Sequence, residues 1–415
     1  MSSLPAAEAT LDHKIELLQP AQDVEEPELS IVIPALDESL TITEFIAWCH
    51  EGLQVANVVG EILIVDSSTD DTAALAVAAG ARVLRVPKRG LGRAYMDAIP
   101  YIRGRWVVMG DADCTYDFRR LAPFVERFRE GYEYVMGSRW KGSIEPGAMP
   151  ALHRYFGTPL TTWILNRLYS SSFSDIHCGM RGITLNALKR MDLQSESWEY
   201  ASEIVLKSVH MDLKTTEVPV TFIKDREGRL SHHKRSGWFS PWSAAWINLR
   251  AMFVYGAEFF VLKPGLILLA LGLLLTIPLS GGVIDVGFAS LSLYTMLLGF
   301  ALSVVGLQSF CLGCLAQVLF DYTGRARRRW SRVFPYTRTV ALSGLMVLLG
   351  VALVVPLVLH WLGNQYTLGA PGALHNHLAV MGLTLGVMGY QLFAFTLMLH
   401  GSILATTRRR PDVGD

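Results

Sequence analysis

Net charge and cysteine are the two things that this sequence has least of. Lysine plus arginine and aspartate plus glutamate both total 37 in 415 residues, so the net charge is zero. This balance gives none of the overall basic character that favours nucleic-acid binding, and we expect no nucleic-acid partner. The five cysteines are scattered along the chain, and their spacing predicts neither a disulfide framework nor a zinc site.

Charge is missing altogether from three long stretches in the second half of the chain. These stretches are Pro264 to Ile284, Val286 to Phe320 and Thr339 to Thr407. Each is long enough for the roughly 20 apolar residues that a membrane-spanning helix needs. The third is interrupted by "GNQYTLGAPGALHNH", so it must hold two spans. The sequence therefore predicts four membrane spans, at about 264–281, 294–320, 339–362 and 379–404.

Arginine clusters orient these spans. "GRARRRWSR" (324–332) and "TTRRR" (406–410) are strongly basic, whereas the other two connections contain only Asp285. By the positive-inside rule, the clusters and both termini face the cytoplasm. The first residues are polar and acidic and do not form a signal peptide, so we read residues 1–27 as a disordered tail. We expect a multi-pass protein of the cytoplasmic (inner) membrane with its soluble domain on the cytoplasmic side.

The soluble part alternates short apolar runs with segments of helical length. The runs are "LSIVIPA", "EILIVD", "ARVLRV", "RWVVMGD" and "EYVMGS". This rhythm predicts βαβ units and a largely parallel sheet covered by helices, an α/β fold. In such sheets ligands bind at the carboxyl ends of the strands.

Acidic residues follow three of these strands. Asp37 and Asp70 follow the first and second, where capping of the next helix is an equally good explanation. Asp111 and Asp113 follow the fourth strand, and Thr115 or Asp117 could cap the next helix without them. Two such carboxylates repel each other unless a cation or a donor lies between them. Their oxygen ligands suit Mg²⁺ or Mn²⁺.

Six ordered blocks resemble the family 2 glycosyltransferases. They are "LSIVIPALDES", "EILIVDSSTDDT", "KRGLGRA", "VVMGDADCTYDF", "VMGSR" and "IHCGMRG". Within that family, the sequence is most similar to the polyprenyl- and dolichyl-phosphate glycosyltransferases, including dolichyl-phosphate mannose and glucose synthases. The resemblance implies a nucleotide-sugar-binding GT-A fold followed by an all-α transmembrane domain.

The resemblance also implies the domain organisation and the substrates. We expect inverting transfer of a hexose from UDP-glucose or GDP-mannose to a polyprenyl or dolichyl phosphate. The expected segments are a tail (1–27), the GT-A domain (28–238), interfacial helices (239–262), the transmembrane domain (263–405) and a cytoplasmic tail (406–415).

Donor-site residues follow from the matching blocks. In relatives a glutamine two residues past the second aspartate often joins the metal shell, whereas this chain has Thr115 there. The sequence therefore identifies no third protein ligand for the metal. The implied nucleotide-sugar contacts are Pro34, Ala35, Glu38, Asp66, Lys88, Gly90, Asp111 and Ala112, and the implied ligands of Mg²⁺ or Mn²⁺ are Asp111 and Asp113.

The acceptor in these relatives is a lipid phosphate, which is largely ionised at neutral pH and needs no strong general base. Cations must position it, and arginine binds phosphate through two parallel hydrogen bonds. Relatives commonly have Arg-Glu-Gly followed by Ser-Lys, and this chain has His232 in place of the lysine. The same basic stretch could instead contact lipid headgroups. The candidates are Arg139, Arg154, Arg181, Arg226, Ser231, His233 and Lys234, with Asp113, Arg139, Arg226 and Glu203 expected to act in catalysis.

Glu203 has two readings. It lies one helical turn after Glu199, near the position where hydroxyl-accepting relatives carry a catalytic base. With a phosphate acceptor it could orient the sugar, or it could simply pair with an arginine.

Two other functions remain open at this stage. A processive polysaccharide synthase shares these blocks, but its Q-x-x-R-W motif is missing here. A lipid-sugar transporter or scaffold with a degenerate transferase domain would not need Asp111 and Asp113. The four spans could still assist lipid movement or homo-oligomerisation.

Overall fold

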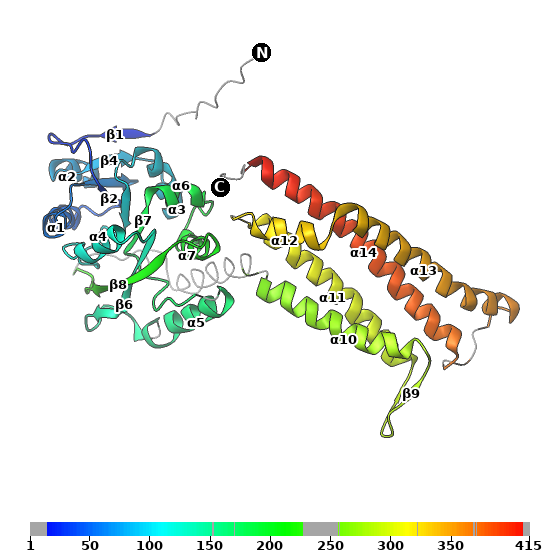
Figure 1. The fold of residues 1–415 in the computed structure, drawn as a ribbon. Coiled ribbons are helices and arrows are strands. Elements are labelled where there is room, and N and C mark those ends of the chain that lie inside the picture. The colour runs from blue at the N-terminus through cyan, green and yellow to red at the C-terminus, as the bar shows by residue number, and fades with distance from the viewer. Residues whose placement is uncertain are drawn as a thin grey trace, which may run out of the picture. The chain divides into compact units, whose positions relative to one another are not determined.

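The structure is a computed structural model that describes residues 15–151, 153–169, 171–226, 256, 258–321, 323–367, 370 and 372–409. The chain divides into two compact units between Met252 and Phe253. The first is an α/β unit and the second is helical (Figure 1). The predicted interfacial segment 239–262 lies largely outside the described residues.

An eight-stranded sheet forms the centre of the first unit, in the order β1-β4-β3-β2-β5-β7-β6-β8. Six strands run in one direction, and β1 and β7 run against their neighbours. The prediction of a largely parallel sheet is therefore confirmed. The strands are β1 (Glu16–Leu18), β2 (Leu29–Ala35), β3 (Gly60–Asp66), β4 (Arg82–Arg85), β5 (Trp106–Met109), β6 (Tyr134–Ile144), β7 (Arg181–Thr184) and β8 (Thr215–Phe222).

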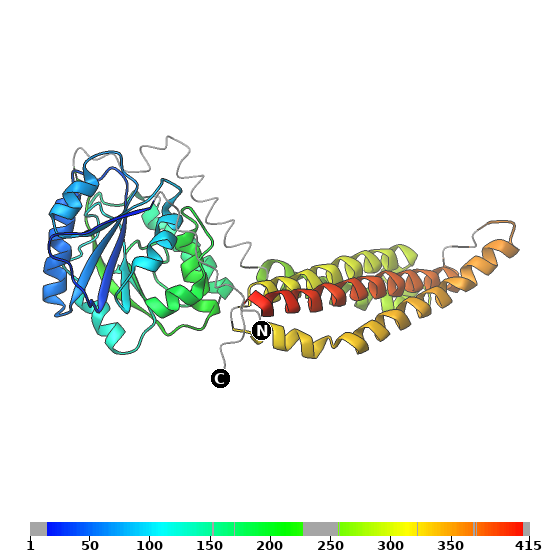
Figure 2. The ribbon, with the colours of Figure 1, turned by 90° about the horizontal axis from the view of Figure 1, so that it is seen from above.

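Helices cover both faces of this sheet (Figures 1 and 2). Because both faces are covered, the central strands β2, β3 and β5 are almost entirely buried. The helices are α1 (Ile42–Val55), α2 (Thr72–Ala78), α3 (Leu91–Ala98), α4 (Ala122–Arg129), α5 (Thr158–Tyr169), α6 (Leu185–Met191) and α7 (Tyr200–His210). Short 3-10 and π turns occupy Ile99–Tyr101 and His153–Gly157.

Part of the predicted disordered tail is ordered. Strand β1 pairs with the edge strand β4, and Asp23 accepts a hydrogen bond from Arg103 at 2.8 Å. The edge of β4 offers unpaired backbone groups, and these bind the segment despite its acidic composition. The prediction of disorder is wrong for residues 15–27.

The second unit contains four helices that are long and apolar enough to cross a membrane. They are α10 (Lys263–Leu279), which a π turn at Glu258–Leu262 precedes, α11 (Leu293–Leu319), α13 (Tyr336–Gly363) and α14 (Leu374–Arg409). Each covers one of the predicted spans to within two residues of its ends, so the prediction of about four spans is confirmed. A two-stranded hairpin, β9 (Ile284–Asp285) and β10 (Ser290–Leu291), joins α10 to α11.

The basic loop between α11 and α13 forms a short helix, α12 (Arg325–Val333). Trp330 fixes one face of α12 to the bundle, because its ring nitrogen donates to Gln317 of α11 at 2.8 Å. Arg327 is buried beside Asp321, with 3.6 Å between the guanidinium nitrogen and the carboxylate. Arg325, Arg328, Arg329 and Arg332 remain exposed. These four exposed arginines mark one end of the helical bundle, which we call the arginine-bearing end.

Candidate active site

The carboxyl ends of β2, β3 and β5 lie side by side, and we call the side of the sheet that these strand ends form the carboxyl edge. In the register, Ala35 pairs with Asp66, and Val32 pairs with Met109. The predicted acids therefore gather at a single edge, as parallel strands require.

Two loops at this edge are bonded to each other. The Asp37 backbone amide donates to the Ser68 hydroxyl at 2.7 Å, and the Thr69 amide donates to the Asp37 carboxylate at 3.1 Å. Asp37 adopts a positive φ of 55°, which turns the chain sharply after β2. Asp70 accepts hydrogen bonds from the amide and hydroxyl of Thr72. These two aspartates therefore connect and brace the loops.

Asp66 ends β3 and is almost fully buried. One carboxylate oxygen accepts from the Ser68 amide at 3.2 Å, whereas the other has no hydrogen-bond donor among the described residues and lies 4.0 Å from the Arg85 guanidinium. Burial raises the pKa of Asp66, although hydrogen bonds from Ser68 oppose this effect. Such an oxygen is placed to accept a hydrogen bond from a ligand.

Glu38 and Ala112 are linked by a residue that sequence reasoning missed. Thr41 donates to the Ala112 carbonyl at 3.0 Å and lies 3.3 Å from the Glu38 carboxylate. Glu38 is itself buried. A threonine before a helix predicts only a helix cap, and this long-range bond has no local sequence signal.

Asp111 and Asp113 lie immediately beyond β5. One oxygen of Asp113 accepts from both the amide and the hydroxyl of Thr115, at 3.0 and 2.6 Å. The threonine at the expected glutamine position thus orients Asp113. The backbone of Gly179 approaches Asp111 so closely that a Cβ atom on this glycine would lie 2.5 Å from the carboxylate.

The donor set fits a divalent cation only in part. Asp111 and Asp113 supply carboxylate oxygens, which Mg²⁺ and Mn²⁺ prefer. Among the described residues, no group of three or more His, Cys, Asp or Glu side chains could hold a metal ion. The residues present therefore suit a cation that takes its other ligands from a substrate and from water.

Two buried tyrosines frame this pair of aspartates. The Tyr95 hydroxyl donates to the Gly110 carbonyl at 3.1 Å, and the Gly179 amide donates to the Tyr116 hydroxyl at 2.8 Å. Burial raises the pKa of both tyrosines well above its usual value, so both hydroxyls stay protonated. They hold the backbone on either side of Asp111.

Two predicted acceptor cations are buried and already paired. Arg139 forms a two-pronged ion pair with Asp175, at 2.6 and 2.8 Å. Arg181 donates to the carbonyls of Cys178 and Ala201 at 2.6 and 3.0 Å. Asp175 is a partner that the sequence did not reveal. Both arginines lie near the carboxyl edge. Their binding to a phosphate stays a prediction.

The remaining predicted cations lie farther out. Arg226 follows β8 and pairs with Glu44 of α1, and both side chains are about half exposed. Arg154 stacks on its neighbour Tyr155, while Lys88 and Gly90 lie in an exposed loop. Ser231, His233 and Lys234 lie outside the described residues.

Glu203 pairs with a lysine, Lys207. Both side chains are fully buried, and their charged atoms are 2.5 Å apart. The Glu203 carboxylate also accepts from the amides of Gln194 and Ser195, at 2.9 and 2.8 Å. Lys207 donates to the carbonyls of Met191 and Asp192, at 3.0 and 2.7 Å. The pair thus holds the loop at residues 191–197.

That loop packs against Gly90 and the first turn of α3. A Cβ atom on Gly92 would lie 2.0 Å from the Ser195 carbonyl, and one on Gly90 would lie 2.3 Å from the Glu196 carbonyl. The Arg93 amide donates to the Glu196 carbonyl at 2.9 Å. The buried Glu203–Lys207 pair is therefore connected, through one loop, to the predicted nucleotide-sugar loop at Lys88 and Gly90.

Comparison with known proteins identifies relatives of both units. Residues 30–192 match Glycosyl transferase family 2, and residues 316–402 match the Glycosyltransferase family 2 C-terminal transmembrane region. The low-salt glycan biosynthesis hexosyltransferase Agl6 of Haloferax volcanii is 32% identical over 393 residues, 94% of this chain and 92% of that protein. A dolichyl-phosphate hexose transferase of the same organism is 28% identical over 168 residues, 40% of this chain and 72% of that protein.

A solved structure resembles the chain more distantly. Glucosyl-3-phosphoglycerate synthase from Mycobacterium tuberculosis, in complex with Mn²⁺, UDP and glucosyl-3-phosphoglycerate, is 20% identical with a TM-score of 0.42. The match covers 55% of this chain and 80% of that one.

Proposed function

The chain belongs to glycosyltransferase family 2, and from this premise we propose that it transfers a hexose from a nucleoside-diphosphate sugar to the phosphate of a polyprenyl lipid. The observation that carries the proposal is the pair Asp111 and Asp113 at the carboxyl end of β5, on a chain with four helices that could span a membrane. UDP-glucose and GDP-mannose are the donors to test. The dolichyl-phosphate hexose transferase of Haloferax volcanii supports the choice of acceptor.

Donor binding uses the edge formed by β2, β3 and β5. Asp66 offers a buried oxygen that can accept an N–H of the nucleobase. Asp111 and Asp113 would hold Mg²⁺ or Mn²⁺ beside the diphosphate, and the bound cation would neutralise charge on the departing nucleoside diphosphate. Thr115 keeps Asp113 turned toward this position.

The acceptor phosphate oxygen attacks the anomeric carbon as the bond to the diphosphate breaks, which inverts the configuration. The phosphate is already ionised at neutral pH, so no side chain needs to remove a proton. Glu203 is bound to Lys207 and to two backbone amides, which supports a positioning role over a role as base. Arg226, together with Ser231, His233 and Lys234 of the segment that follows it, would position the phosphate.

The arginine-bearing end of the bundle would face the cytoplasm. The exposed arginines of α12 and the basic end of α14 support this orientation by the positive-inside rule. The catalytic unit would then lie on the cytoplasmic side, where nucleotide sugars are available.

The proposed function is tested by a panel of nucleotide sugars assayed against a polyprenyl phosphate and the matching free polyprenol. We expect glycosylation of the phosphate with one donor and none of the alcohol. Transfer to the alcohol or to a glycan end, with the phosphate inert, would contradict the acceptor assignment. The product phosphodiester is identified by mass spectrometry.

Replacing Arg226 should affect the lipid more than the donor. Loss of one charge-assisted hydrogen bond of about 1.5 to 3 kcal/mol predicts that Arg226→Ala raises the apparent KM for polyprenyl phosphate about ten- to a hundred-fold. The KM for the sugar nucleotide should stay unchanged, since Glu38, Asp66 and Asp111 lie on other strand ends. Steady-state kinetics with each substrate varied in turn gives both constants.

Two further variants sharpen this experiment. Glu44→Gln removes the carboxylate that pairs with Arg226, so it should lower the lipid KM. Arg105→Ala is the control, because Arg105 forms a similar exposed pair with Glu28 just before β5 begins, at the opposite edge of the sheet. Equal weakening of both substrates by Arg226→Ala would instead place Arg226 beside the diphosphate.

A further inference from the structure

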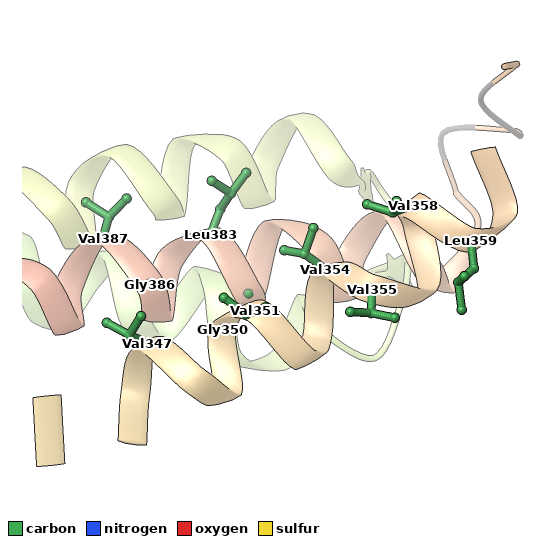
Figure 3. Close-up of a pocket in the computed structure, with 11 residues that line it drawn as sticks. Val347, Gly350, Val351, Val354, Val355, Val358, Leu359, Leu383, Gly386 and Val387 are labelled. Carbon is green, nitrogen blue, oxygen red and sulfur yellow. The ribbon is translucent and has the colours of Figure 1, made fainter. Parts of the chain in front are cut away.

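An apolar groove of about 400 Å³ runs between α13 and α14. Six valines, three glycines and two leucines line it. Figure 3 shows Val351, Val355 and Val358 on α13, with Leu383 and Val387 on α14. No charged or polar side chain is among the lining residues, so only a hydrocarbon ligand suits it.

The groove exists because the two helices cross at glycines. A Cβ atom on Gly350 would lie 2.6 Å from the Gly382 carbonyl, and one on Gly382 would lie 2.5 Å from the Gly350 carbonyl. Gly382 and Gly386 form the G-x-x-x-G spacing that lets membrane helices approach closely. The valines beside the crossing are stiff at χ1 and short, so they cannot swing in to fill the space. The groove is therefore preformed.

The distance of the groove from the arginine-bearing end limits which lipid chains can reach it from that end. At 1.5 Å per residue, the groove begins at Val347, about 14 Å along α13 from the exposed Arg338, and ends at Leu359, about 32 Å from it. Half of the hydrocarbon core is only about 15 Å thick. A phospholipid tail anchored at the arginine-bearing end thus stops near the start of the groove, whereas a longer chain continues into it.

We propose that the groove between α13 and α14 binds the distal part of a long polyisoprenoid chain, that of the acceptor lipid, while its phosphate lies at the arginine-bearing end. This inference rests on the proposed function and adds a specificity site for acceptor length. Charge complementarity fixes the direction of the lipid. Arg325, Arg328, Arg329 and Arg332 are exposed at the end where α13 begins, and the opposite connection between α10 and α11 carries an aspartate.

The test compares two acceptors in the full-length protein in nanodiscs. Farnesyl phosphate is too short to enter the groove from the arginine-bearing end, whereas a long polyprenyl phosphate can reach Leu359. Val351→Trp fills the groove from a side chain that is 60% exposed, so it does not disturb the core. An isoprenoid that leaves lipid for the groove gains packing and no hydrophobic free energy, so the KM for the long acceptor should rise only about three- to ten-fold. The KM for farnesyl phosphate should not change.

A second groove-filling variant and a matched control variant complete the experiment. Leu383→Trp fills the groove from α14 and should give the same result. Leu345→Trp is the matched control, because Leu345 is equally exposed on α13 but does not line the groove, and it should change neither KM.

Three results would overturn the proposal. They are an equal effect on both acceptors, no effect on either, and a change in oligomeric state by light scattering without an effect of acceptor length. The last would make the groove an interface between copies of the chain. Failure of the proposed function is distinguishable, because then the wild-type protein would glycosylate neither phosphate.

Discussion

Asp113→Ala should reduce glycosyl transfer by about 10²- to 10³-fold or more, the range found when a group that stabilises transition-state charge is removed. Two hydrogen bonds from Thr115 orient Asp113, and among the described residues no third His, Cys, Asp or Glu side chain joins Asp111 and Asp113 in a metal-binding group. With few carboxylates available, loss of one leaves the cation too weakly held to offset charge on the leaving diphosphate. Initial rates over a range of Mn²⁺ concentrations measure the effect.

Graded and control variants separate this effect from a general loss of structure. Thr115→Val removes the hydroxyl donor while keeping the amide, so it should cost about 0.5 to 1.5 kcal/mol, several-fold in rate. Asp71→Ala removes an exposed acid from the neighbouring loop, where it makes no side-chain cap, and should leave the rate unchanged. Full activity of the wild-type protein in excess chelator would rule out the metal requirement.

The strands at the centre of the sheet were predictable because their pattern is local. "LSIVIPA" and "EILIVD" are continuous apolar runs of strand length, as expected for strands buried on both faces. Strands β1, β7 and β8 were not predicted. β1 and β7 are short and run antiparallel to the strands they pair with, and β8 pairs with β6 from about 80 residues farther along the chain, so the place of each depends on partners far away in the sequence.

In the candidate site, too, local patterns were predictable and long-range contacts were not. Asp111 and Asp113 could be identified because they follow a strand directly, and strand ends are where ligands bind in such sheets. The ion pair of Arg139 with Asp175 spans 36 residues, and the bond from Thr41 to Ala112 spans 71. Contacts of this kind depend on how the whole chain folds, and no local pattern reports them. The sequence therefore predicted the positions of these aspartates beyond a strand end, but not the contacts that surround them.

The second large effect concerns the buried pair of Glu203 and Lys207. Removing one partner of a buried ion pair leaves an uncompensated charge and costs about 3 to 5 kcal/mol. Lys207→Met should therefore lower the thermal unfolding midpoint of the catalytic unit by roughly 10 °C, at about 2 to 4 °C per kcal/mol for a unit of this size. Lys214→Met is the control, because Lys214 is exposed and its ammonium makes only surface contacts that include the Glu130 carbonyl and the Tyr132 ring. Tryptophan fluorescence of the detergent-solubilised protein follows the transition.

The double variant Glu203→Gln with Lys207→Met then distinguishes a positioning residue from a catalytic base. Replacing both partners of a buried pair by neutral groups of similar volume is often nearly neutral for stability. The double variant should therefore recover most of the thermal midpoint. If Glu203 positions the loop at residues 191–197 against Gly90 and Gly92, kcat should stay within several-fold of wild type, and the KM for the sugar nucleotide should rise more than that for the lipid. A base at this position would instead be lost in the double variant, with a fall in kcat of about 10²- to 10⁴-fold and loss of the acid limb of the pH profile.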